Sequence, residues 1–403
     1  MQLGWVDFSD EDRDKTLAVI QLLQEKGAVD ELGIGTIRDG FANCFFPGTS
    51  TIQTRAKYFL IVPYILKEAT EVKLRNNAHS EIMKYIDERE IESALQLLKV
   101  GDSGIIGRVS LPDRWVARPP SVIYWSGIKR LGILKAQYSS MSISQYVAVA
   151  SSQKKLKQNI YLGNRNDKAE ENETDDKDAG ADNMLHFWNL PTYRKDWFNN
   201  LNIKLLPAEA SFLKRQIIKE TEGTLFSCLL KNNIVVDEYP DFISLSNSKA
   251  VSSNISEEIG KMLNLANLFN RLYHLANIRY NVLLHGDGGV QNGAGEAWEE
   301  AFTDNYIAEL PSEEELKEIY FRLKISDGYL KMFLGKILTC FKNKNIDLAD
   351  HLIAEQEKHL KHERAKLGKP GKLDPVTWVG SPWLDYRFYT ARRIIDDIYE
   401  GEA

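Results

Sequence analysis

One segment of the sequence cannot belong to a hydrophobic core. Residues 164–183 contain no large apolar side chain, so burial cannot offset the entropy cost of ordering them. We therefore predict an acidic, flexible linker over residues 161–183. This linker separates an N-terminal domain, residues 1–160, from a C-terminal domain, residues 184–403. The whole chain has 403 residues, which is long enough to form two hydrophobic cores.

Apolar residues recur at helical spacing on both sides of this linker. Leu17, Ile20 and Leu23 show the spacing in the N-terminal part. In the C-terminal part it is shown by Ile259, Leu263, Ala266, Phe269, Leu272, Tyr273 and Ala276. β-Branched clusters occur only at residues 105–106 and 234–236, and both are short. The predicted fold is therefore mainly α: two helical parts joined by an acidic disordered linker, with at most a small β-ribbon.

Charge is strongly segregated along the chain. The net charge is −6, and residues 167–182 alone hold eight acids and two lysines. Residues 107–160 hold nine lysines or arginines and one acid, a balance of +8. A stretch with almost only positive charge attracts polyanions. We therefore expect a nucleic acid, and specifically DNA, as the partner. The alternative is that acids from other parts of the fold neutralise these side chains.

A helix-turn-helix-like pair precedes the basic stretch. The signals predict a short helix from Gly35 to near Phe45, a turn at Pro47-Gly48, and a second helix from Thr51 to about Ala69. Its first turns carry hydroxyl, amide and cationic side chains of the kind that contact phosphates and bases. An ordinary amphipathic helix would explain the same pattern. The candidate nucleic-acid-binding residues are Thr51, Gln53, Thr54, Arg55 and Lys57 from this helix, and Arg108, Arg114, Arg118, Lys129 and Arg130 from the basic module.

Four stretches of the sequence form distinctive motifs: LGWVDFS at 3–9, ELGIGTIRDGF at 31–41, FPGTSTIQTRAKYF at 46–59 and WLDYRF at 383–388. These motifs resemble those of an uncharacterised bacterial family associated with phage-defence islands. Genes of this family tend to lie beside genes for helicases and phospholipase-D-type nucleases. The resemblance therefore implies a subunit of a DNA-handling defence assembly. It implies no catalytic residues.

Four side chains of metal-ligating types fall on one stripe of a predicted helix: His351, Glu355, His359 and His362. The ends of this stripe lie about 16 Å apart along a straight helix, too far to share one ion. Lysines surround the stripe, as on a solvated helix. We therefore expect no metal site here.

Two further clusters also favour structural roles. The glycine-rich loop 285–295 is followed by acids at 296, 299 and 300. Because these acids would repel a phosphate, we interpret the loop as a connector between helices. Aromatic residues and arginines alternate over residues 378–393. We expect them to dock the last helix onto its own domain, with Trp383, Tyr386 and Ile394 facing inward and Asp396, Asp397 and Glu400 exposed.

Signatures of known enzymes are missing from the sequence. It has no phosphate-binding loop, no dinucleotide fingerprint, no zinc-protease helix and no nucleophile elbow. The three cysteines lie far apart, which disfavours disulfides and thiolate metal sites. We therefore expect no catalytic residues, no cofactor and no metal.

The sequence also predicts a cytoplasmic location and no membrane contact. The longest apolar run, Tyr58–Leu66, has nine residues and contains Pro63, far fewer than the roughly 20 needed to span a bilayer. The N-terminus is acidic, unlike a secretory signal.

These features lead to one functional prediction and two alternatives. We expect a non-catalytic, DNA-contacting accessory subunit of a multi-subunit antiviral (anti-phage) complex, working with a helicase or nuclease partner. The first alternative is a nuclease-like, metal-dependent hydrolase whose ligands come from distant segments. The second is a protein-interaction scaffold that never touches nucleic acid.

Overall fold

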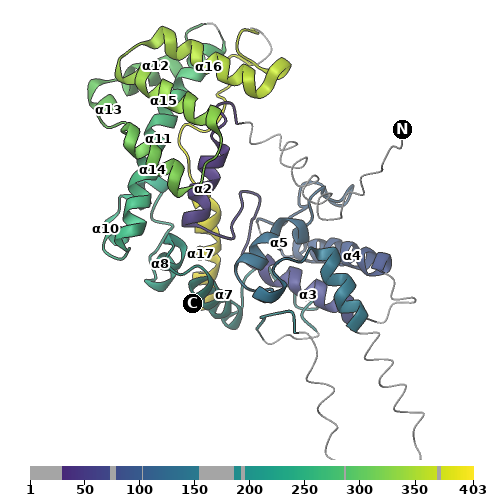
Figure 1. The fold of residues 1–403 in the computed structure, drawn as a ribbon. Helices are drawn as coiled ribbons and strands as arrows, with labels where there is room; N and C mark the ends of the chain where they lie inside the picture. The colour runs from purple at the N-terminus through teal and green to yellow at the C-terminus, as the bar shows by residue number, and fades with distance from the viewer. Residues whose placement is uncertain are drawn as a thin grey trace, which may run out of the picture. The chain divides into compact units, whose positions relative to one another are not determined.

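The computed structural model describes residues 30–72, 79–101, 103–153, 186–191, 196–285, 287–369 and 374–403 (Figure 1). Within these ranges the fold is helical and contains no strand, which confirms the mainly α prediction. One isolated antiparallel bridge joins Leu134 to Trp188. The β-branched clusters at 105–106 and 234–236 lie in turns and connections. The helix expected around Leu17 and the linker at 161–183 lie outside the described residues.

Contacts divide the chain into two compact units, each made from segments far apart in sequence. Unit 1 comprises Met1–Phe41 and Met262–Leu384, and unit 2 comprises Ala42–Lys261 and Asp385–Ala403. Unit 2 thus contains residues from both sides of the predicted linker. This grouping differs from a division of the chain at residues 161–183.

Unit 2 is organised around helix α3, Tyr58–Glu71. Ten of its 14 residues are buried, so it is the apolar centre of this unit. Helices α4 (His79–Leu98) and α5 (Pro120–Arg130) both pack against it. The other helices that lie wholly within unit 2 are η1 (Ala136–Tyr138), a helix at 143–153, α7 (Pro207–Glu220), α8 (Leu225–Lys231), α9 (Phe242–Ser246), α10 (Lys249–Ser252) and α17 (Phe388–Glu402).

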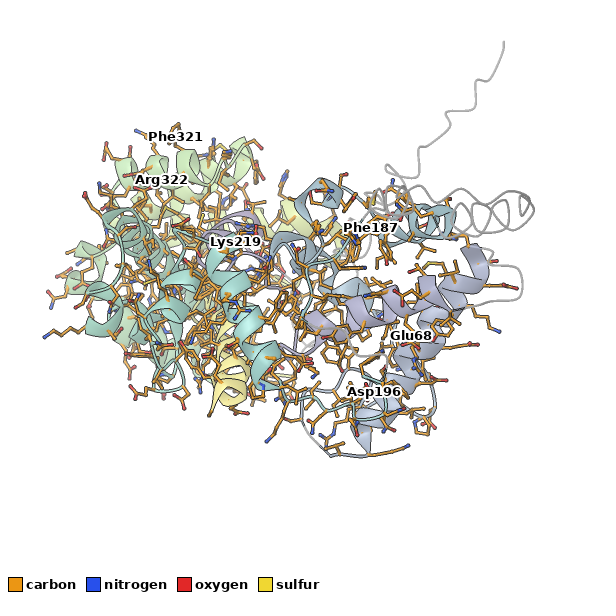
Figure 2. The ribbon with its side chains drawn as sticks, turned by 90° about the horizontal axis from the view of Figure 1, so that it is seen from below. Glu68, Phe187, Asp196, Lys219, Phe321 and Arg322 are labelled. Carbon is orange, nitrogen blue, oxygen red and sulfur yellow. The ribbon has the colours of Figure 1, made fainter. Side chains whose placement is uncertain are left out.

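A glutamate of α3 ties several of these elements together. Glu68 (Figure 2) accepts hydrogen bonds from the Tyr85 hydroxyl of α4, at 2.6 Å, and from the Trp197 indole N–H, at 2.8 Å. It also pairs with Arg89 of α4 at 2.9 Å. The Arg89 guanidinium lies 3.7 Å from the centre of the Phe198 ring, a cation–π contact. Segment 196–201 is thereby fixed to α3 and α4.

Unit 1 is built on the long helix α11, Glu257–Leu284, whose first residues belong to unit 2. Helix α2, Gly35–Phe45, is likewise shared between the units. The remaining helices of unit 1 are α12 (Ala294–Ala301), α13 (Asp304–Ala308), α14 (Glu313–Arg322), α15 (Gly328–Lys342), α16 (Ile346–Lys361) and η2 (His362–Arg364). No helix in the described ranges is long and apolar enough to cross a membrane.

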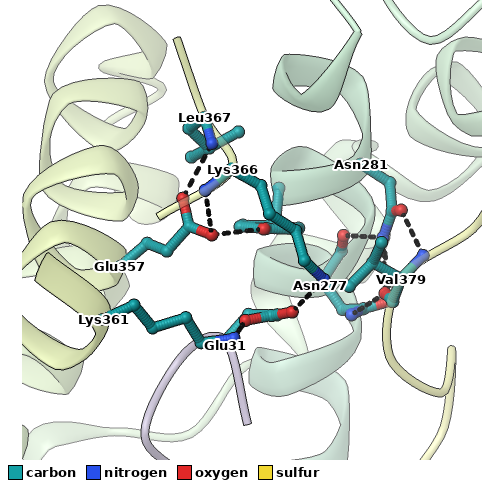
Figure 3. A network of polar contacts seen from close by, with 9 residues as sticks. Glu31, Asn277, Asn281, Glu357, Lys361, Lys366, Leu367 and Val379 are labelled. Atoms are coloured by element: carbon teal, nitrogen blue, oxygen red, sulfur yellow. Dashed lines mark hydrogen bonds and ion pairs between the residues drawn. The ribbon is translucent and has the colours of Figure 1, made fainter. Parts of the chain in front are cut away.

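Asparagines of α11 hold segment 377–384 through its main chain. Asn281 accepts from the Val379 N–H at 2.7 Å and donates to the Val379 carbonyl at 2.9 Å (Figure 3). Asn270 makes the same two-way contact with Leu384, at 2.9 and 3.0 Å. Each side-chain amide thus satisfies a buried backbone donor and acceptor, as a neighbouring strand would.

A buried carboxylate fixes the chain just after α16 (Figure 3). Glu357 is fully enclosed and accepts three hydrogen bonds: from the Tyr280 hydroxyl at 2.7 Å and from the main-chain N–H groups of Lys366 and Leu367 at 2.9 Å each. The Lys366 ammonium also bonds to Glu31, at 2.6 Å. The three bonds to Glu357 give its buried carboxyl oxygens hydrogen-bond partners, as buried polar groups require.

We expect the buried Glu90 of α4 to make the stability of the protein sensitive to pH. It accepts hydrogen bonds from the Ser121 N–H, at 2.6 Å, and hydroxyl, at 3.3 Å, and burial raises its pKa to about 8. The unfolded carboxyl titrates at about 4.3. The pKa of Glu90 is therefore higher in the folded state than in the unfolded state. The contribution of Glu90 to the free energy of unfolding is fully present below the unfolded-state pKa and is lost as pH rises through the folded-state pKa.

We therefore expect Glu90→Gln to become more stable relative to the natural protein as pH rises, because glutamine cannot ionise. Urea unfolding of both proteins at about pH 6 and about pH 9 checks this expectation. A stability difference that stays constant between the two pH values would contradict it.

Candidate nucleic-acid interface

The segment that precedes α3 is not helical. Helix α2 spans Gly35–Phe45 as predicted, but α3 begins at Tyr58 rather than at Thr51. Residues 51–57 form turns and extended backbone, so the predicted helix start is wrong. We call residues 48–57 the turn segment.

Side chains from distant elements hold the turn segment in this shape. The Tyr124 hydroxyl accepts from the N–H groups of Thr54, at 2.7 Å, and Arg55, at 3.0 Å. Asp397 accepts from the Ala56 N–H at 2.7 Å. In a helix these N–H groups would bond to the helix's own carbonyls or face solvent. Here they bond to side chains of distant elements, so tertiary contacts override the local preference for a helix start.

Arg55 is enclosed in unit 2 rather than presented to a ligand. It is 8% exposed, and its Nε and Nη2 atoms each lie 2.8 Å from Oδ1 of Asp397. Its Nη1 donates to the Ser103 carbonyl at 3.1 Å. Burial raises the pKa of Asp397, while the Arg55 hydrogen bond acts against this shift. Asp397, expected to be exposed, is therefore buried as the counter-ion of Arg55.

Two further predicted contacts are also enclosed. Gln53 is 2% exposed; it accepts from the Ser50 N–H and donates to the Gly48 carbonyl, both at 3.2 Å. Lys57 pairs with Glu209 of α7, and desolvation lowers its pKa against the raising effect of that carboxylate. Internal partners occupy the polar groups of Gln53, Arg55 and Lys57. These three residues are therefore not part of the candidate interface. Thr51 is exposed and Thr54 is half-buried.

The turn segment positions the loop that follows α4. Besides the Arg55 bond to Ser103, the Tyr58 hydroxyl accepts from the Ile106 N–H at 3.0 Å. Gly104, at φ +78°, lies so close that a Cβ there would meet the Arg55 side chain at 2.9 Å. The start of the loop is thus fixed against the turn segment and the first residue of α3.

Beyond this anchored start, the chain presents a basic surface that we call the arginine loop, residues 107–118. Arg108 and Arg114 are exposed and Arg118 is half-buried. Two main-chain bonds of 2.9 Å, from Leu111 to Gly107 and from Arg114 to Ser110, fold the loop back on itself. The structure therefore brings three of the predicted contacts together on one short loop.

The other two predicted contacts close helix α5. Lys129 and Arg130 lie in its last turn, where cations are favoured by the helix dipole. Arg130 is exposed and donates to the Glu220 carbonyl at 2.7 Å. The Lys129 ammonium lies 6.0 Å from the centre of the Trp125 ring, and partial burial lowers its pKa. Of the two, Arg130 is the more available to a phosphate.

The structure does not gather the histidine stripe into a metal site. Helix α16 ends at Lys361, and His362 has a φ of +49°, so it leaves the helical stripe. His359 stacks on the Tyr329 ring at 3.8 Å. His351 and Glu355 are exposed, with Nδ1 and Oε2 3.5 Å apart. Among the described residues, no three histidine, cysteine, aspartate or glutamate side chains are placed to share an ion.

The glycine-rich loop is closed by its own contacts. Asp287 accepts from the Gly289 N–H at 2.8 Å, and this hydrogen bond lowers its pKa. The Gly295 N–H, close to the start of α12, donates to the Gly289 carbonyl at 3.0 Å. These two N–H groups are not free to hold a phosphate, which fits a connector; Gly286 lies outside the described residues.

The C-terminal cluster docks only in part as expected. Tyr386 and Ile394 are fully buried, as predicted, whereas Trp383, also predicted to face inward, is half-buried. The Arg387 guanidinium donates to the Asn43 side chain at 2.7 Å and to the Thr49 carbonyl at 2.9 Å. This arginine therefore braces the turn segment within unit 2.

Comparison with known proteins covers the part of the chain that carries this interface. A family model described as a family of unknown function (DUF6361) matches residues 1–166. The matched range includes the turn segment, the arginine loop and α5. Neither the curated proteins nor the solved structures compared with the chain gave a significant match. Over residues 1–166 the chain is therefore similar to this family.

Proposed function

We propose that the chain is a non-catalytic, cytoplasmic, DNA-contacting subunit of a bacterial anti-phage complex that works with a helicase or a phospholipase-D-type nuclease. The observation that carries the DNA contact is the arginine loop. Residues 103–135 hold six lysines or arginines and a single acid, Asp113, and Arg108 and Arg114 are exposed there. Such a surface attracts the phosphate backbone.

The chemistry of the loop suits phosphates better than bases. Guanidinium groups form paired hydrogen bonds with phosphate oxygens and keep their charge at all physiological pH values. The loop is short and its start is fixed by the turn segment, so the arginines need little further ordering to bind. Contacts of this kind set affinity and orientation without reading sequence.

The defence role and its partners are supported by the four stretches that resemble the defence-associated family. The turn segment and the arginine loop both fall within the range matched by the family model, residues 1–166. In this proposal the chain holds DNA, and the partner enzyme supplies the chemistry.

The test is a charge reversal on the loop. We expect Arg108→Glu/Arg114→Glu to weaken binding of the full chain to duplex DNA by about tenfold or more at low salt, because two phosphate contacts are replaced by repulsion. Fluorescence anisotropy with two duplexes of unrelated sequence measures the change. The loss should be the same for both duplexes.

A matched control separates the loop from net charge. Lys249→Glu/Lys261→Glu changes the net charge equally at two exposed positions elsewhere in unit 2. The control should bind DNA with the affinity of the natural chain. An equal loss in both variants, or no loss in the loop variant, would refute the proposal.

A further inference from the structure

An apolar groove runs between three helices of unit 1. Helices α14, α15 and α16 enclose a volume of about 710 Å³. Its apolar lining comes from all three helices: Leu316, Tyr320, Met332, Cys340, Leu348 and Leu352. Met332 and Leu348 remain 46% and 47% exposed, so the groove is open to solvent along its rim.

The groove itself is a contiguous apolar surface, since three helices contribute to its lining and its rim residues Met332 and Leu348 are exposed. An exposed apolar patch of this kind usually marks an interaction site. Phe321 of α14 (Figure 2) is 85% exposed but does not line the groove.

The charged residues at the groove are mostly positive. Lys317, Lys331 and Lys336 line it, against one acid, Glu313. None of these three lysines forms an ion pair with a carboxylate in the described ranges of the chain. The Lys331 ammonium lies 5.6 Å from the centre of the Tyr320 ring, and the Tyr320 hydroxyl has no hydrogen-bond partner among the described residues. The groove therefore favours acceptors and negative charge in whatever fills it.

We propose that this groove binds an acidic amphipathic helix of a partner protein. Helices dock in such grooves through apolar side chains spaced three or four residues apart. Methionine at the rim adapts its shape to the side chains it meets. Flanking aspartates or glutamates on the bound helix would pair with Lys317, Lys331 and Lys336, which gives the groove selectivity by charge.

This inference does not depend on the proposed DNA contact. The groove belongs to unit 1 and the arginine loop to unit 2, so each can be disabled by itself. If the chain binds DNA but no peptide, the groove proposal has failed. If it binds the peptide but no DNA, the proposed DNA contact has failed.

The experiment uses the full chain and two labelled synthetic peptides of about 18 residues, five helical turns, with leucines on one face. One peptide carries glutamates beside the leucine face and the other carries lysines at the same positions. In fluorescence anisotropy we expect the acidic peptide to bind at least about tenfold tighter than the basic one.

Variants of the groove then locate the site. Met332→Glu/Leu348→Glu, at two exposed positions, should weaken the acidic peptide by about tenfold or more, and Lys331→Glu/Lys336→Glu should reverse the preference between the peptides. Val290→Glu, at a residue of unit 1 that is 76% exposed and does not line the groove, is the control and should bind as the natural chain does. Circular dichroism and urea unfolding check that each variant is folded.

Three results would overturn the proposal. These are equal binding of the two peptides, no binding of either, and peptide binding unaffected by the groove variants. Uptake of a small apolar dye at Met332 and Leu348 that the acidic peptide does not displace would assign the groove to small molecules instead.

Discussion

Replacing Asp397 by alanine is expected to lower the free energy of unfolding by about 3–5 kcal/mol, because it leaves the buried Arg55 guanidinium without its counter-ion. Asp397 also accepts the Ala56 N–H, so the same change removes a bond that keeps the turn segment out of a helix. Urea unfolding followed by tryptophan fluorescence measures the loss.

The neighbouring Asp396 provides a matched control. It is half-buried and lies 3.9 Å from Arg392, and desolvation, with Asp237 adding to it, raises its pKa to about 6. Such a pair contributes little, so Asp396→Ala should change stability by less than about 1 kcal/mol. Equal unfolding midpoints for the two variants would contradict the role of Asp397.

The second large effect is expected at Asn281, whose side chain is fully buried. Asn281→Asp keeps the shape but cannot donate to the Val379 carbonyl, which Asn281 meets at 2.9 Å. It also places a carboxylate against carbonyl oxygens without a cation. We expect a loss of at least about 3 kcal/mol in unfolding experiments and release of segment 377–384.

Asn264→Asp makes the same chemical change at an exposed position of the same helix. Because its side chain is solvated, the change in stability should stay within about 0.5 kcal/mol. Faster hydrogen exchange in segment 377–384 should appear in Asn281→Asp alone. If the two variants behave alike, the asparagines of α11 do not hold this segment.

The parts of the fold that local signals control could be predicted from the sequence. Helix α2 spans Gly35–Phe45 as expected, because Pro47-Gly48 forces a stop soon after it. Pro120 is the first residue of α5, a position that suits proline because its missing N–H would have no partner within the helix. Arg108 and Arg114 are exposed, as charged side chains usually are.

The parts that distant residues control could not be predicted in the same way. Tyr124 and Asp397 decide the shape of the turn segment, and both are far from it in sequence. The partners of Arg55 and Lys57 are also far from them in sequence. The sequence alone therefore assigns these two buried cations to a surface that contacts nucleic acid. One signal was present: Arg55 and Lys57 flank Ala56 directly before the apolar run Tyr58–Leu66, and cations beside such a run are buried when acids elsewhere neutralise them.

The most direct test of the account is the salt dependence of duplex DNA binding by the full chain and by Arg108→Glu/Arg114→Glu. If the arginine loop binds phosphates, the logarithm of the affinity should fall with the logarithm of salt concentration at a slope of about −3 or steeper, because each contacted phosphate releases counterions. The variant should show a slope shallower by about 2. No binding at low salt, or the same slope for both proteins, would contradict the central claim that this loop contacts DNA.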